Sequence, residues 1–110
     1  MAEYHVAVSS RAEQDADDIY VWIARRSPDG ARRWYSAFRK MLCSLEKDPV
    51  RQARAPEAAT LGLDIQQALF KTRYGHTYRA LYTLVGGTVH LIAVRGAGEE
   101  LATLDDVDVS

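Results

Sequence analysis

The chain has 110 residues, of which 47% are hydrophobic and 26% charged, and its formal net charge is −1. This length predicts one globular domain over residues 1–110, with a substantial core and no second domain. No apolar run approaches the roughly 20 residues of a membrane span, and the N-terminus lacks the basic and apolar stretches of a signal peptide. The single cysteine, Cys43, excludes an internal disulfide, so we expect a cytoplasmic protein that does not enter a membrane.

The charges are segregated along the chain. Residues 1–24 carry five acidic side chains and one basic, residues 25–95 carry five acidic and thirteen basic, and residues 96–110 carry five acidic and none basic. The basic middle predicts an acidic partner, either a nucleic acid or an acidic protein segment; the alternative is a plain solvated surface. From about residue 97 we expect a flexible acidic tail. The histidines are scattered and no cysteine pairs with them, so we predict no metal and no cofactor.

The N-terminal half predicts one strand and two helices. Tyr4–Val8 alternates in hydrophobicity, as a short strand does. Ser10 and Glu13 match a capping box, which predicts a helix from about Arg11 to Arg25. The expected core-facing stripe of this helix is Ala12, Ala16, Ile19, Trp22 and Ile23.

A second helix is predicted over Pro28–Lys47. Ser27 is a good N-cap, proline is tolerated at the first helical position, and Asp48-Pro49 ends the helix. Because the link between the helices is short, we expect an antiparallel helical hairpin. The apolar stripe of the second helix is Ala31, Trp34, Tyr35, Phe38, Met41, Leu42 and Leu45. Of these residues, we expect Trp34, Phe38 and Leu42 to pack against Leu81 or its strand neighbours.

After a connecting loop over residues 49–64, with one helical turn at Glu57–Leu61, residues 66–95 predict three antiparallel strands. Their turns lie at residues 74–76 and at Gly86-Gly87, where two glycines allow the positive φ angles of a type I′ turn. Counting outward from Gly86-Gly87 predicts these pairs: Val85 with Thr88, Thr83 with His90, Leu81 with Ile92, and Arg79 with Val94. The resulting fold class is α+β, with an N-terminal strand, a helical hairpin and a three-stranded meander in one sheet covered by the helices.

Several of these features together resemble the RelE/ParE superfamily of toxins from bacterial type II toxin–antitoxin systems. The features are the opening strand, the helical hairpin and, above all, Tyr74-Gly75 followed by the run Tyr78-Arg79-Ala80-Leu81-Tyr82. That run is similar to the family's Tyr-Arg-hydrophobic-hydrophobic-Tyr strand, and the segment from Val89 to Arg95 resembles the strand after it. The resemblance covers essentially the whole chain.

The resemblance implies a growth-inhibiting toxin of the plasmid stabilisation type, held in a hetero-oligomer by a cognate antitoxin. RelE-like members cleave mRNA in the ribosome, whereas ParE-like members poison DNA gyrase. For a nuclease, the resemblance places catalytic functions on Arg79 and Arg95. It places binding of the target on Lys71 and Arg73, which we expect on the preceding strand.

The sequence departs from the nuclease pattern after Arg95. Nuclease members usually carry a His or Tyr there as an acid or base, but this chain continues with Gly96-Ala97-Gly98-Glu99-Glu100. None of these side chains titrates near neutral pH. The departure favours a ParE-like gyrase poison over an mRNA interferase. A non-toxic module that only binds an acidic partner is the alternative from outside the family.

Overall fold

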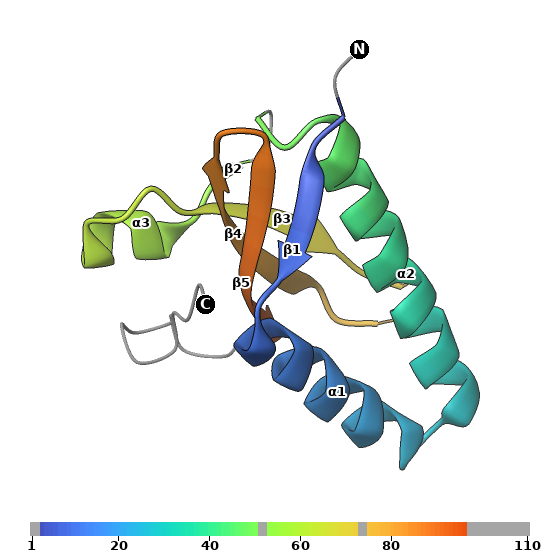
Figure 1. The fold of residues 1–110 in the computed structure, drawn as a ribbon. Helices are drawn as coiled ribbons and strands as arrows, with labels where there is room; N and C mark the ends of the chain where they lie inside the picture. Colours follow the sequence, from blue (N-terminus) through green and yellow to red (C-terminus); the bar gives the residue numbers. More distant parts are fainter. Residues whose placement is uncertain (1–2, 51–52, 73–74, 97–110) are drawn as a thin grey trace.

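A computed structural model describes residues 3–50, 53–72 and 75–96 (Figure 1). The elements in chain order are β1 (His5–Val8), α1 (Ser10–Ala24), α2 (Pro28–Lys47), β2 (Ala53–Arg54), α3 (Pro56–Leu61), β3 (Gln66–Phe70), β4 (Tyr78–Val85) and β5 (Thr88–Gly96). The predicted α+β fold is confirmed, since helices cover one mixed sheet. The expected acidic tail lies outside the described residues.

The five strands form one sheet in the order β1-β5-β4-β3-β2. β1 runs parallel to β5, and every other neighbouring pair is antiparallel. The first strand of the chain therefore lies beside the last one. The sequence did not reveal β2, because two residues carry no periodic signal. The strand that holds Gln66 is shorter than expected, so Lys71 follows β3 instead of lying on it.

The two long helices begin at serine caps. The Ser27 hydroxyl accepts a hydrogen bond from the Gly30 amide, as predicted for α2. The prediction for α1 was wrong by one residue: Ser9 is the N-cap, and Ser10 lies inside the helix. Ser9 takes this position because its backbone is still extended after β1, and its Oγ accepts from the Ala12 amide at 3.1 Å.

α1 and α2 cover one face of the sheet and diverge from their short connection as a V, while α3 lies on the other side (Figure 1). The core under the long helices contains Trp34 and Phe38, whose rings stack with centroids 5.3 Å apart. Both rings also contact Phe70 of β3. Aromatic pairs of this kind stabilise a core beyond the area that they bury.

The expectations about the helix stripes are confirmed in part. Trp34 and Phe38 share their core cluster with Ala80 and Tyr82, the strand neighbours of Leu81, as expected, whereas Leu81 itself packs under α3 with Ile65 and Ala58. Trp22 and Tyr35 are 52% and 47% exposed, so they do not belong to the core. Both lie at the edges of their stripes, where a helical period alone does not separate covered positions from open ones.

The β4–β5 hairpin contains a bulge that the predicted register missed. The pairs next to the turn are as expected, Val85 with Thr88 and Thr83 with His90. Gly86 alone of the two turn glycines has a positive φ, which fits a type II′ turn instead of type I′. Beyond Leu91 the bulge shifts the ladder by one residue, so the actual partners are Leu81 with Ala93, Ala80 with Val94 and Arg79 with Arg95.

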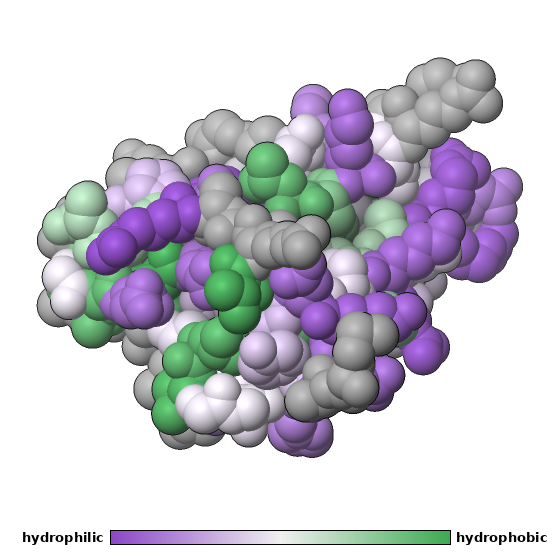
Figure 2. All heavy atoms as spheres, turned by 90° about the horizontal axis from the view of Figure 1, so that it is seen from above, coloured by the Kyte–Doolittle hydropathy of each residue, from purple (hydrophilic) through white to green (hydrophobic). Residues whose placement is uncertain are grey.

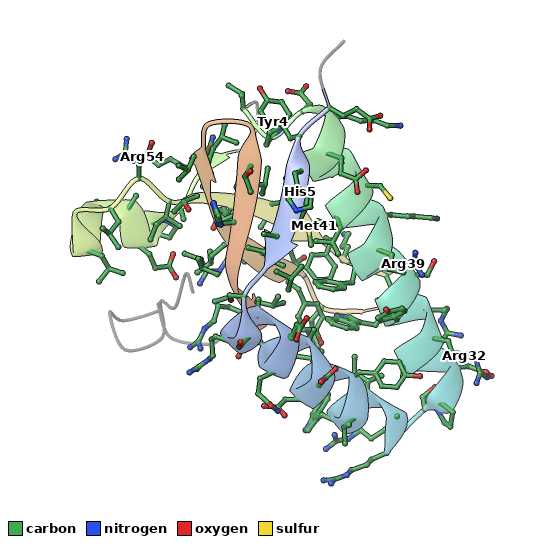
Figure 3. The ribbon with its side chains drawn as sticks, in the orientation of Figure 1. Tyr4, His5, Arg32, Arg39, Met41 and Arg54 are labelled. Carbon is green, nitrogen blue, oxygen red and sulfur yellow. The ribbon has the colours of Figure 1, made fainter. Side chains whose placement is uncertain are left out.

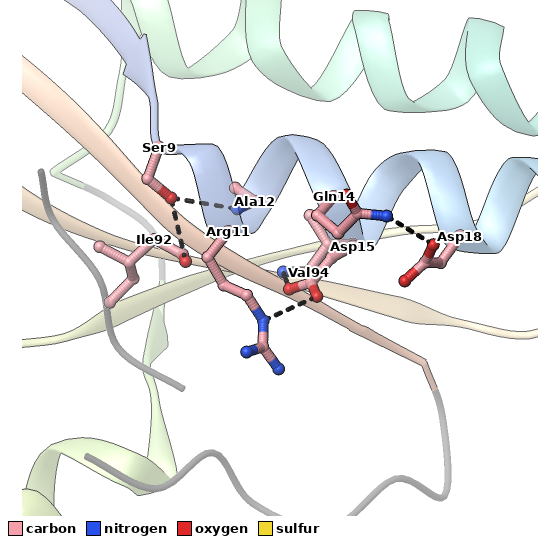
Figure 4. Close-up of polar contacts among 8 residues, drawn as sticks. All are labelled: Ser9, Arg11, Ala12, Gln14, Asp15, Asp18, Ile92 and Val94. Atoms are coloured by element: carbon pink, nitrogen blue, oxygen red, sulfur yellow. Dashed lines mark hydrogen bonds and ion pairs between the residues drawn. The ribbon is translucent and has the colours of Figure 1, made fainter. Parts of the chain in front are cut away.

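The start of α1 holds this bulge in place (Figure 4). The Ser9 hydroxyl donates to the carbonyl of Ile92 at 3.2 Å, and a carboxylate oxygen of Asp15 accepts from the amide of Val94 at 3.0 Å. β1 pairs with β5 only as far as Leu91, so α1 satisfies backbone groups of β5 beyond the end of β1. An unsatisfied buried backbone group costs free energy comparable to a lost hydrogen bond, and these contacts avoid that cost.

Candidate functional site

Arg79 lies on β4 with its guanidinium bound to a buried carboxylate. Its Nη1 and Nη2 donate to the two oxygens of Glu57, each at 2.9 Å, and Nη1 also donates to Gln67 Oε1 at 3.2 Å. Glu57 is fully buried and the Arg79 side chain is 15% exposed. A buried carboxylate is tolerated when it is paired and hydrogen-bonded in this way. Arg79 therefore ties α3 to the sheet.

Arg95 lies directly across the ladder from Arg79 because of the bulge. The predicted register placed Val94 opposite Arg79, with Arg95 on the other face of the sheet. The extra residue, Ile92, turns Val94 toward the long helices and brings Arg95 to the side of Arg79. The structure thus brings together the two arginines that the resemblance singled out.

The other two predicted site residues are not part of this cluster as far as the structure describes them. Lys71 is exposed just beyond the end of β3. Arg73 lies outside the described residues. Glu57, which binds Arg79, was missed by the sequence reasoning. In the sequence, Glu57 is marked only by its position: it is a single acidic residue directly after Pro56, which begins α3, among alanines that are typical of a buried turn.

Tyr82, the second tyrosine of the strand motif, is fully buried and donates a 2.5 Å hydrogen bond to the carbonyl of Pro49. Burial, with a smaller contribution from the nearby charge of Asp48, raises the pKa of Tyr82 well above its usual value of 10. Such a phenol keeps its proton at neutral pH and holds a loop, which makes it a poor acid or base for catalysis.

A second candidate surface lies on the outer side of the long helices. A groove of about 570 Å³ runs along α2 and reaches α1. It is lined by Tyr20, Arg32, Tyr35, Ser36, Arg39, Lys40 and Cys43. Arg32 and Arg39 point away from the sheet, whereas Met41 points toward it (Figure 3). Seen from above, the α2 side of the molecule is largely hydrophilic, and hydrophobic residues gather over the other side (Figure 2).

Comparison with protein-family models places the whole fold in one family. Residues 6–101 match the family described as the ParE toxin of the type II toxin–antitoxin system, parDE. The chain belongs to the ParE toxin family. This ParE family member is therefore a toxin of a type II toxin–antitoxin system and binds a cognate antitoxin, as the resemblance implied. No curated protein matches it in sequence.

Two features are absent from the described residues of this ParE toxin. No helix within them is both long and apolar enough to cross a membrane. The same residues contain no group of three or more His, Cys, Asp or Glu side chains that could hold a metal ion.

Proposed function

We propose that this toxin inhibits growth as a ParE-like poison of DNA gyrase in the cytoplasm, without cleaving RNA. The observation that carries the proposal is the bidentate pair of Arg79 with the buried Glu57. A scissile phosphate at Arg79 would have to displace this carboxylate. The raised pKa of Tyr82 and the missing His or Tyr after Arg95 support the same conclusion.

One observation favours the second candidate, a RelE-like mRNA interferase. The bulge puts Arg79 and Arg95 side by side on neighbouring strands, and two guanidinium groups are a suitable arrangement for stabilising charge on a phosphate. In that function Arg79 and Arg95 are catalytic and Lys71 and Arg73 bind the target. Displacement of Glu57 is then a necessary step before RNA can bind.

The groove along α2 is the proposed surface for the antitoxin, which forms a hetero-oligomer with the toxin. Arg39 and Lys40 offer positive charge, and Tyr20 and Tyr35, in an edge-to-face contact with centroids 6.1 Å apart, offer apolar area. An antitoxin segment with acidic and apolar residues, which folds on binding, is complementary to both features.

Expression of the toxin alone and with the adjacent open reading frame tests the general function. We expect growth arrest that the neighbouring gene relieves. Purified toxin is then added to gyrase with supercoiled DNA and, separately, to ribosomes translating a defined mRNA. Accumulation of cleaved DNA–gyrase complexes with intact mRNA is the expected result. Cut mRNA with unaffected gyrase would establish the second candidate instead.

Charge reversals test the antitoxin surface. Arg39→Glu and Lys40→Glu should weaken antitoxin binding at least tenfold, because like charges replace complementary ones. Arg54→Glu is the matched control, since Arg54 is also exposed but lies on β2, away from the groove (Figure 3). Equal affinities for all three variants, measured by calorimetry, would place the antitoxin elsewhere.

A further inference from the structure

A small pocket lies at the bend between the two long helices, away from both the arginine cluster and the groove along α2. We call it the elbow pocket. It has a volume of about 190 Å³, and its lining includes Trp22, Ser27, Arg33, Trp34, Thr72 and His76. Pockets for drug-sized ligands begin at about 300 Å³. The elbow pocket therefore suits a ligand part no larger than a single planar ring system.

The lining is rich in aromatic rings. Both tryptophans of the chain, Trp22 and Trp34, contribute to it, together with His76 and Tyr78. Trp22 is 52% exposed, although burial is the usual place for a ring of this size. Arg26 already stacks over it, with the guanidinium carbon 3.9 Å from the ring centroid. Arg26 thus covers one face of Trp22, and the exposed remainder of the ring is available to a planar partner.

One lining residue, Trp34, also carries an unused hydrogen-bond donor. Trp34 is 2% exposed, and its indole Nε1 is buried with no hydrogen-bond partner within residues 3–50, 53–72 and 75–96. Buried donors are nearly always paired, because an unpaired one retains its full desolvation penalty. Because this nitrogen is buried, an acceptor atom of a ligand in the elbow pocket pairs with it only by displacing the side chains that cover it.

Positive charge lies beside the opening, although the first turn of α2 also carries the acidic Asp29. Arg33 lines the pocket, and no acidic side chain does so within the described part of the chain. Ser27 and Gly30 place the first turn of α2 in the lining. The N-terminal end of a helix of 20 residues carries the positive end of its dipole and favours anions.

From these four features we propose that the elbow pocket binds one nucleotide of a single-stranded nucleic acid, with the base among the aromatic rings and the phosphate near Arg33. An acidic peptide or inorganic phosphate would use the charge of Arg33 and has oxygens that accept from the Trp34 donor, but neither supplies a planar group to stack on the aromatic rings. Base stacking on aromatic side chains is tolerant of sequence, so the site selects single strands rather than a sequence. This inference goes beyond the proposed function and does not depend on the host target.

Intrinsic fluorescence locates the binding event, because both tryptophans of the toxin lie at the pocket. The purified full-length toxin is titrated with a short oligothymidylate, with the matching oligouridylate, and with the corresponding duplex. Saturable quenching by the single strands, and little by the duplex, is expected. The two oligonucleotides also show whether the site prefers DNA or RNA. An absence of saturable quenching by either single strand would overturn the proposal.

Variants are compared by the anisotropy of a labelled oligonucleotide. Trp22→Ala and Arg33→Ala should each weaken binding about tenfold. Trp34→Phe, which keeps a ring but removes the N–H donor, should weaken binding several-fold in protein that is still folded, and the gap left by the smaller ring should lower the melting temperature. The controls are Tyr35→Ala and Arg54→Ala, which remove an exposed ring and an exposed charge elsewhere. Equal losses of affinity for Arg33→Ala and Arg54→Ala would show non-specific charge attraction and refute the site. The site would also be refuted if an oligoglutamate peptide or inorganic phosphate competed with the labelled oligonucleotide as strongly as thymidine monophosphate does.

Discussion

The pair formed by Arg79 and Glu57 gives the sharpest test of the structure. Replacing Arg79 with methionine keeps much of the side-chain volume but leaves the carboxylate of Glu57 buried without its two donors. Breaking a buried ion pair by removing one partner costs about 3–5 kcal/mol. With total stabilities of about 5–15 kcal/mol and urea m values of about 1–3 kcal/mol/M, the midpoint of urea unfolding should fall by roughly 2 M.

Glu57→Gln should cost less, about 1–3 kcal/mol. Its amide oxygen still accepts one hydrogen bond, and the partly exposed Arg79 can turn toward water. The double variant Glu57→Leu with Arg79→Met should recover most of the loss, because well-packed apolar residues often replace a buried pair without destabilising the fold. A double-mutant cycle measures the coupling of the two side chains. It compares the urea unfolding curves of the wild type, of Glu57→Leu and Arg79→Met, and of this double variant. A cost below about 1 kcal/mol for Arg79→Met, or additive losses in the double variant, would refute the buried pair.

The double variant also separates folding from function. Arg79→Met alone can abolish toxicity simply by unfolding the protein. If the double variant is stable and still arrests growth, Arg79 is no part of the reaction, as expected for a gyrase poison. If it is stable and harmless, Arg79 acts on the target and the nuclease function gains support.

Three further predictions concern the fold. Phe38→Ala should cost about 3–5 kcal/mol in chemical denaturation, since its ring is buried among other rings; a loss below 1 kcal/mol would contradict the core. Asp15→Ala should cost about 1–3 kcal/mol and speed amide exchange at Val94, whose acceptor it removes; unchanged exchange there would argue against this contact. The pKa of Tyr82 is raised in the folded state. The contribution of Tyr82 to the free energy of unfolding is therefore complete below pH 10 and is lost as the pH rises further, because the phenol then ionises more readily in the unfolded chain. Tyr82→Phe should make the free energy of unfolding less dependent on pH above pH 10 than it is in the wild type. At neutral pH the substitution should cost about 1 kcal/mol, because the Pro49 carbonyl loses its donor. Equal slopes of unfolding free energy against pH for the two proteins would contradict this account.

The sequence predicted those parts of the fold that depend on local signals. Ser27 followed by Pro28 marked the start of α2, and the helix occupies the predicted residues. The strand Tyr78–Val85 also ends at the predicted glycine turn, because its run of β-branched and aromatic residues stops at Gly86. The positions that were misplaced depend on long-range contacts. Ser9 caps α1 in place of Ser10, and its hydroxyl also bonds to Ile92, a residue far away in the chain.

The candidate site shows the same limit. Arg79 could be named from its motif, but its partner Glu57 lies 22 residues earlier on a helix of a single turn or so. No period or spacing links the two residues, and only the packing of α3 against the sheet brings them together. The wrong assignment of Trp22 to the core has a related reason. A helical stripe predicts which face of a helix is buried, but neighbouring elements determine how much of that face they cover.

The bulge in β5 determines which arginines share a face of the sheet, and hydrogen bonds from the start of α1 hold this bulge in place. A regular ladder would place Val94 opposite Arg79 and turn Arg95 toward the aromatic core under the long helices. Inserting Ile92 as an extra residue moves Arg95 to the side of Glu57 and Arg79 and lets Val94 fill the core instead. Asp15 then binds the amide of Val94. The first half of α1, through Ser9 and Asp15, therefore fixes the position of Arg95 on the opposite face of the sheet.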